Sequence, residues 1–234
     1  MTVTSRRWPR FALALALGSA LTTLSWGQVG YEHDYPAPEP GTYDLPAIKA
    51  AADGKVLGAD GKARRLSELL RGHVTILSFI YTRCADPTAC PHASGVLYQI
   101  HQQTKSDPAL ARDLQLLTFS FDPEHDTPQV MARYGDGLRG GGQRDDVPGS
   151  PWHFLTTAGS RDLKPILEAY GQRVDRKKSP DDPLGPLNHL VRVYLIDENQ
   201  RIRNIYSFGL MDPRLLLADV RTLLRESRGR ASAG

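Results

Sequence analysis

The sequence has few cysteines, few methionines and, apart from its first residues, no excess of charge of either sign. Two of the 234 residues are cysteine and three are methionine, counting the first. So few methionines exclude a methionine-rich metal site, and a domain of this size does not depend on a disulfide framework. Hydrophobic residues make up 40% and charged residues 24% of the chain. This globular composition predicts one domain and excludes a disordered or multi-spanning membrane protein.

The formal net charge of +3 comes from the first 27 residues alone. Three arginines precede an apolar run at 11–24, which ends at the small residues Ser25 and Gly27. This pattern predicts a secretory signal peptide at 1–27 and a mature N-terminus at Gln28. The other 207 residues hold 26 basic and 26 acidic side chains, so we expect no nucleic-acid partner.

This signal predicts that the chain is exported, but it leaves open whether the exported protein stays anchored in the membrane. The apolar run is shorter than the roughly 20 residues of a membrane-spanning helix, which favours cleavage over an uncleaved anchor. We therefore expect the protein in the periplasm or anchored to the outer face of the cytoplasmic membrane, with membrane contact only if the signal is uncleaved. Ser5, Arg6 and Arg7 also resemble a twin-arginine signal, so the Sec and Tat routes both stay open.

The rest of the chain divides into three parts. Residues 28–45 are rich in proline and lack a periodic apolar pattern, which predicts an extended leader. A folded domain is predicted at 46–225. Residues 226–234 are predicted to form a disordered tail.

Two continuous apolar runs, at 74–81 and 114–121, are typical of strands buried on both faces. The helical spacing at 91–105 between them predicts a right-handed crossover with parallel strands. The other predicted elements are a hairpin at 55–62 that turns at Asp60 and Gly61, helices at 66–70, 129–134, 163–170 and 213–224, a strand at 152–155, loops at 136–151 and 173–187, and a second hairpin of strands 191–196 and 201–206. This order predicts a thioredoxin-like α/β fold, with a central mixed sheet flanked by helices and an N-terminal hairpin.

Both cysteines occupy the predicted junction between a strand and a helix. Cys84 follows the run at 74–81, and Cys90 precedes Pro91 at the expected helix start. Unpaired N–H groups at a helix start lower the pKa of a nearby thiol, and Arg83 is expected to add to this effect. The resulting thiolate binds metals or attacks disulfides. The alternative is a structural disulfide, which would contribute little because it closes a short ring.

Several separated stretches resemble the Sco/SenC family of copper chaperones. They are 79–84 (FIYTRC), Cys90 with Pro91, 120–128 (SFDPEHDTP), 152–156 (WHFLT), and His189 ahead of 193–197 (VYLID). The resemblance extends from about Gly54 to Leu224. It implies a thioredoxin fold outside the cytoplasmic membrane that binds copper through Cys84, Cys90 and His189. It also implies delivery of copper to a cuproprotein, by analogy the binuclear copper centre of cytochrome oxidase.

The spacing of the cysteines departs from this family, which usually has three residues between them. Five residues, 85–89, separate them here. Because Cys90 keeps its place before Pro91, we expect the two extra residues to lengthen the loop, with Cys84 adjusting. Two thiolates and an imidazole remain a soft ligand set suited to Cu(I), and imidazole also suits Cu(II).

Other polar residues are interpreted as structural. His92 competes with His189 as third ligand, but His189 directly precedes a predicted central strand and is therefore preferred. His125 and His153 are assigned to a helix start and a strand face. The carboxylates Asp122, Glu124 and Asp126 are typical of a strand exit and a helix cap. The basic residues 176–178 are interpreted as the solvated face of a loop.

Three functions compete on these grounds. A metallochaperone needs no catalytic residue. A thiol–disulfide oxidoreductase would use Cys84 and Cys90, but the chain has no C-x-x-C and places Val191 where such enzymes commonly have a cis-proline. A thiol peroxidase is disfavoured because Leu77 stands where its motif has proline. The metallochaperone is the preferred hypothesis.

Overall fold

The computed structural model describes residue 1, residues 35–139 and residues 149–233. The predicted signal peptide, the start of the leader and most of the glycine-rich loop lie outside the described residues. The strands are β1 (Lys49–Ala50), β2 (Lys55–Gly58), β3 (Ala63–Arg65), β4 (Val74–Ile80), β5 (Leu114–Ser120), β6 (Trp152–Thr156), β7 (Val174–Arg176), β8 (Leu187–His189), β9 (Arg192–Ile196) and β10 (Arg201–Ser207).

Eight of these strands form one mixed sheet, in the order β1-β10-β9-β4-β5-β6-β2-β3. β4 lies parallel to β5 and β5 parallel to β6, whereas β9 pairs antiparallel with β4. Every residue of β4 and β5 is buried, as their continuous apolar sequence predicts. The predicted mixed sheet, parallel crossover and N-terminal hairpin are confirmed.

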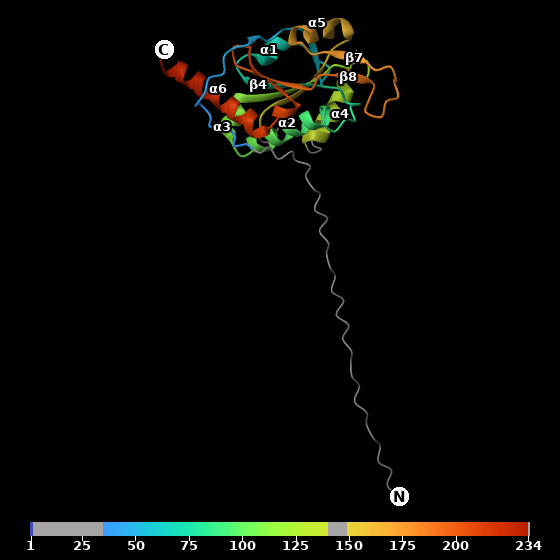
Figure 1. Ribbon diagram of the computed structural model, residues 1–234, viewed down its shortest axis with the longest axis horizontal. Coiled ribbons are helices and arrows are strands. Elements are labelled where there is room, and N and C mark those ends of the chain that lie inside the picture. The colour runs from blue at the N-terminus through green and yellow to red at the C-terminus, as the bar shows by residue number, and fades with distance from the viewer. Residues whose placement is uncertain (2–34, 140–148, 234) are drawn as a thin grey trace. The chain divides into compact units, whose positions relative to one another are not determined.

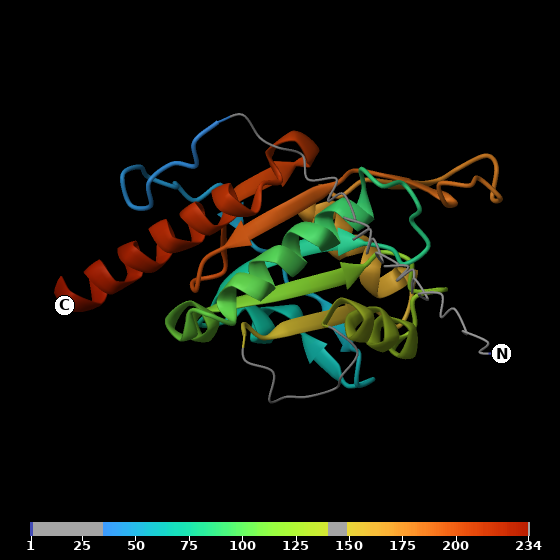
Figure 2. The same ribbon diagram turned by 90° about the horizontal axis from the view of Figure 1, so that it is seen from below.

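Helices cover both faces of the sheet. They are α1 (Leu66–Leu70), α2 (Cys90–Thr104), α3 (Pro108–Asp113), α4 (Pro128–Arg139), α5 (Ser160–Tyr170), the short 3-10 helix η1 (Phe208–Leu210) and α6 (Pro213–Ala233). α2, α3, α4 and α6 lie on one face, and α1 and α5 lie on the other (Figure 1). Figure 2 looks onto the first face, where α2 runs along the sheet between α6 and α4. In the described part of the chain, no helix has the length and apolarity needed to cross a membrane.

α4 is longer than predicted, because Gly135 does not end it. The helix continues to Arg139 and thereby takes in the first residues of the predicted loop at 136–151. A side chain at Gly135 would clash with the ring of Phe154, whose nearest atom would lie 2.7 Å from the added carbon. The glycine therefore permits close packing of α4 on β6 instead of stopping the helix.

The predicted disordered tail is wrong, since α6 extends through it to Ala233. Ion pairs hold the last turns: Arg203 binds Glu226 at 2.9 Å, and Arg230 binds Glu198 at 3.1 Å. In the leader, 35–45 contains no helix or strand, yet it is anchored on α6. Tyr43 donates a hydrogen bond to Asp219 at 2.6 Å.

A hairpin that was not predicted begins in the predicted loop at 173–187 and ends at His189. β7 and β8 pair antiparallel in a separate two-stranded sheet, with Val174 opposite His189. Strands of three residues are too short to give a periodic apolar signal. The hairpin matters because β8 carries a candidate ligand.

Candidate metal centre

Cys84, Cys90 and His189 come together in the fold. The Nε2 atom of His189 lies 3.3 Å from the Sγ atom of Cys90 and 4.0 Å from that of Cys84. All three potential ligand atoms lie within 4.8 Å of one another, and no other such group of three occurs among the described residues. Both cysteines are free thiols, with 8% and 2% of their surfaces exposed, so a structural disulfide is absent here.

The loop between the cysteines is built from local hydrogen bonds. The Asp86 side chain accepts from the backbone N–H and the hydroxyl of Thr88, at 2.9 and 2.7 Å. The N–H of Ala89 donates to the Asp86 carbonyl at 3.0 Å and closes a turn just before α2. This turn accommodates the widened spacing while Cys90 remains the first residue of the helix. The expectation that Cys90 keeps its helix-start position is confirmed.

Two aromatic rings pack against the imidazole of His189 and orient it. The imidazole lies edge-on to Tyr81, with centroids 5.3 Å apart, and 5.2 Å from the ring of Phe121. Its Nδ1 atom lies 3.4 Å from the Leu187 carbonyl oxygen. A neutral imidazole that donates from Nδ1 to this carbonyl would keep Nε2 free to bind a metal beside the thiols.

The β7–β8 hairpin is tied directly to the cysteine loop. The N–H of Ala85 donates to the Leu184 carbonyl at 3.3 Å, and the Tyr81 hydroxyl reaches the same carbonyl at 3.4 Å. Gly185 has a φ of +99°, and a side chain there would collide with the Tyr81 hydroxyl and the Arg83 carbonyl. Glycine at this position therefore allows the hairpin to approach the cysteines.

The two thiols have opposite electrostatic characters. The Cys90 thiol, helped by His189 and by backbone N–H groups of the loop and helix start, lowers the pKa of Cys84 to about 4. Burial, with the adjacent Cys84, raises the pKa of Cys90 well above its usual range. At Cys90, burial outweighs the lowering of the pKa that the helix start was predicted to give, so Cys84 is the thiol that ionises first. Arg83 contributes elsewhere, since its guanidinium binds the Asp122 carboxylate at 2.7 Å.

Asp126 organises the chain just before Cys84. Its carboxylate accepts hydrogen bonds from the Thr82 N–H, at 2.9 Å, and from the hydroxyls of Thr82 and Ser120. The residue is completely buried. It was predicted to cap α4, but the side chain that accepts from the first turn is that of Thr127, 3.4 Å from the Val130 N–H.

The other sequence candidates lie outside the cluster of ligands. His92, on the first turn of α2, packs its ring 5.0 Å from that of Phe208. His153 lies in β6, where burial lowers its pKa, and His125 precedes α4. The basic segment at 176–178 is largely exposed, as predicted, and its Arg176 forms an exposed ion pair with Glu124 at 2.6 Å. Tyr81, Phe121 and Asp126 were not predicted as supports of the site, since no local pattern reveals such long-range contacts.

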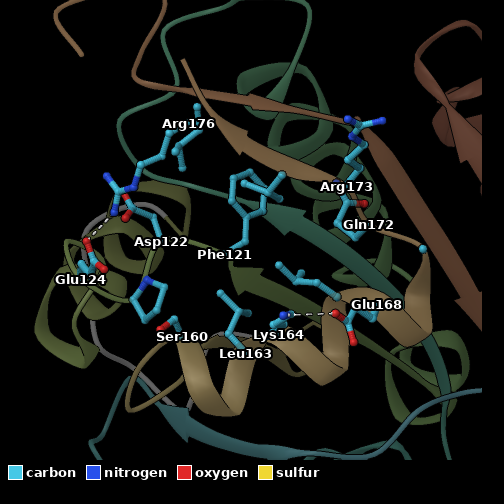
Figure 3. Close-up of a pocket in the computed structure, with 15 residues that line it drawn as sticks. Phe121, Asp122, Glu124, Ser160, Leu163, Lys164, Glu168, Gln172, Arg173 and Arg176 are labelled. Atoms are coloured by element: carbon cyan, nitrogen blue, oxygen red, sulfur yellow. Dashed lines mark hydrogen bonds and ion pairs between the residues drawn. The ribbon is translucent and has the colours of Figure 1, made fainter. Parts of the chain in front are cut away.

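A cavity of about 580 Å³ opens behind the histidine, between α5, the β7–β8 hairpin and the turn after β5. Phe121 belongs to its wall (Figure 3), as does Leu187. Phe121 also contacts His189. Each charged side chain that lines it belongs to an ion pair, such as that of Lys164 with Glu168 at 3.8 Å (Figure 3). This cavity is thus separated from the thiols by an aromatic wall.

A second cavity of about 500 Å³ lies on the thiol side, between α2 and α4. Its lining includes Cys84 and Cys90 together with residues of both helices. The candidate metal centre is therefore flanked by two cavities, only one of which is lined by the two cysteines.

Comparisons with known proteins agree on one family. The SCO1/SenC family profile matches residues 55–225. The mitochondrial SCO2 homolog of Bos taurus is 30% identical over 165 residues, which cover 69% of this chain and 56% of that protein. The chain thus spans little more than half of this relative.

Solved structures share the fold. The copper-bound ScoI of Arabidopsis thaliana matches with a TM-score of 0.62 and 21% identity, over 76% of this chain and 99% of that one. BsSco, a member of the Sco family of cytochrome c oxidase assembly proteins, matches with a TM-score of 0.57 and 20% identity, over 77% and 98%. These likenesses confirm the predicted thioredoxin-like fold.

Proposed function

The chain belongs to the SCO1/SenC family, and from this premise we propose that it is a copper metallochaperone that holds its cargo between Cys84, Cys90 and His189. The observation that carries the proposal is the convergence of these three ligand atoms, within 4.8 Å, from the cysteine loop and a distant hairpin. Two sulfurs and one imidazole nitrogen suit Cu(I), and a nitrogen ligand also suits Cu(II).

The state of the thiols supports copper binding. Thiolate, not thiol, is the ligand form, and the lowered pKa of Cys84 supplies one thiolate at neutral pH. Copper would displace the second proton from Cys90, whose charge the ion would then compensate. His189 completes the set as a neutral imidazole.

Delivery to a cuproprotein is the second part of the proposal. BsSco is named for cytochrome c oxidase assembly, and the Arabidopsis neighbour has copper bound. We propose a copper site of an oxidase subunit as the recipient. Three ligands leave the ion room for an incoming ligand from that recipient, so transfer can proceed by exchange without release of free copper.

The location proposed for this activity is outside the cytoplasmic membrane, on the grounds of the arginines, apolar run and small residues at 1–27. Mass spectrometry of the exported protein is expected to find Gln28 as its first residue. An intact N-terminus in a membrane fraction would instead indicate an anchor.

A thiol–disulfide oxidoreductase is the second candidate, favoured by the Cys84 thiolate next to the Cys90 thiol. Such a pair can attack a disulfide with one sulfur and resolve the mixed disulfide with the other. Within the described residues no peptide bond is cis, so the cis-proline site typical of such enzymes is absent there.

Substitution of His189 separates the two functions. His189→Ala is expected to weaken Cu(I) binding at least about tenfold, as measured by competition with bicinchoninate, because a ligand is lost. Disulfide reduction by the two cysteines would persist. His92→Ala is the matched control and should leave copper affinity within about twofold of the parent. Unchanged copper affinity in His189→Ala would contradict the three-ligand site.

A further inference from the structure

The cavity on the thiol side is an open groove whose walls are α2 and α4. From α2 it is lined by Pro91, Ser94, Gly95 and Tyr98, and from α4 by Tyr134, Gly137 and Leu138. These positions recur at helical spacing, so each set forms one face of its helix. Tyr81 and Thr82 complete the lining, which contains no aspartate, glutamate, lysine, arginine or histidine side chain. We refer to these residues and the two cysteines as the α2–α4 groove.

Two glycines keep the groove wide without being required by the fold. A side-chain carbon added at Gly95 or Gly137 would meet no atom within 4 Å, and neither residue has a positive φ. Gly135, two residues before Gly137 in α4, differs because the ring of Phe154 fills its space. Glycine inside a helix is unfavourable, so its presence at two open positions facing one groove suggests that a partner's backbone approaches there.

The groove is also the side from which the bound metal can be reached. On the side away from the groove, the ring of Phe121 packs against His189. On the groove side, both sulfur atoms belong to residues of the lining. Exchange of ligands requires the recipient's own ligand atom to bond to the ion, and of the two cavities beside the site only the groove is lined by the two cysteines.

The chemistry of the lining indicates what enters. Tyr98 is 41% exposed at the groove, and Leu184, whose carbonyl binds the cysteine loop, is 46% exposed. Exposed apolar side chains around a functional site are typical of protein interfaces. The charges of the other cavity, by contrast, pair with one another.

Resting on the proposed chaperone function, we infer that the recipient inserts an uncharged, apolar loop into the α2–α4 groove, next to its own copper ligands. The loop's backbone would pass over Gly95 and Gly137, and its apolar side chains would pack against Tyr98 and Leu138. The groove thus selects the recipient, whereas the three ligands hold the metal.

Filling the groove tests this inference. Gly95→Leu and Gly137→Leu add side chains into open space and replace glycine by a better helix former, so both variants should fold at least as stably as the parent. Gly229→Leu in α6 is the matched control, because Gly229 is also helical with open space around it. Thermal unfolding measures whether the three variants are as stable as the parent.

The measurement is Cu(I) transfer from the loaded full chain to the apo copper domain of an oxidase subunit, followed spectroscopically. Both groove variants should transfer about tenfold more slowly, and Gly229→Leu should match the parent within about twofold. Copper affinity should stay within about threefold of the parent in every case. Tyr98→Arg, which places a charge in the groove, should also slow transfer.

Normal transfer by both groove variants would overturn the inference while leaving the chaperone function intact. Failure of the parent itself to transfer copper would instead refute the proposed function. Parent dimerisation that Gly95→Leu abolishes would show a second copy of the chain in the groove, and would also overturn the inference.

Discussion

The two sides of the proposed metal centre are held in different ways. The cysteine side is local: two ligands six positions apart are placed by the end of β4, a short turn and the start of α2. The histidine side is remote, because His189 reaches the thiols only through the β7–β8 hairpin, about 100 residues along the chain. Local geometry provides the thiolate, while long-range packing decides whether a third ligand is present.

The supports of the two sides differ accordingly. A buried carboxylate, Asp126, accepts two hydrogen bonds from Thr82, just before Cys84, and one from Ser120 at the end of β5. The hairpin is held by aromatic packing and by weaker backbone contacts at 3.3 to 3.5 Å. Loss of a cysteine-side support should therefore cost more stability than loss of a histidine-side support.

Asp126→Ala should have the largest effect. It removes the acceptor of three buried or part-buried donors, which is expected to lower the free energy of unfolding by about 2 to 4 kcal/mol. Urea unfolding measures the loss. Asp136→Ala, which breaks a partly exposed pair with Arg139, is the control and should cost less than about 1 kcal/mol. An equal loss of unfolding free energy in the two variants would contradict a special structural role of Asp126.

Gly185→Val tests the histidine side. A β-branched residue at a φ of +99° would be strained by about 1 to 3 kcal/mol and would push the hairpin from Tyr81. Copper affinity should fall at least about tenfold, as for loss of His189, while both thiols remain titratable. Gly209→Val, at an exposed position with open space, is the control. Copper affinity unchanged in Gly185→Val would show that the hairpin does not place His189.

The contrast between the two sides also explains what could be predicted from the sequence. The continuous apolar runs at 74–81 and 114–121 made the central strands evident, and Pro91 marked the helix start beside Cys90. These signals are local. The ligand set was predicted through the resemblance to a family, and the fold brings the same three residues together.

The remainder depends on contacts between distant residues. The hairpin at 173–189 was missed because its three-residue strands are embedded in a charged, proline-rich segment. The role of Gly135 depends on Phe154, and the ordered end of α6 depends on ion pairs with Glu198 and Arg203. The raised pKa of Cys90 follows from burial and the lowered pKa of Cys84 from its hydrogen bond with Cys90, and the position at a helix start reveals neither.

The two cysteines should differ in their reaction with iodoacetamide in the reduced, metal-free protein. Because the pKa of Cys84 is lowered to about 4, its thiolate is present throughout the range from about pH 5 to 9, and its alkylation rate should be nearly constant there. An ordinary thiol would react about tenfold faster per pH unit over most of this range. Peptide mapping identifies the alkylated residue.

The pH dependence of Cys84 alkylation should also be measured in His189→Ala, because it tests whether the histidine side affects the cysteine side. His189 is one of the groups that lower the pKa of Cys84, so its loss should shift the profile toward higher pH. Cys90, whose pKa is raised by burial, should react more slowly than Cys84 in both proteins. Faster alkylation of Cys90 would reverse the assignment of thiolate and thiol.

Arg176→Ala should have the smallest effect, although it also lies on the histidine side. Arg176 of β7 binds Glu124 at 2.6 Å, but the two side chains are 70% and 67% exposed. An exposed ion pair contributes about 0.2 to 1 kcal/mol, because water and salt screen it. Unfolding in low and high salt should therefore differ little between parent and variant, and copper affinity should be unchanged. A larger loss than in Gly185→Val would mean that surface charges, not the contacts of Tyr81 with the hairpin, hold His189 in place.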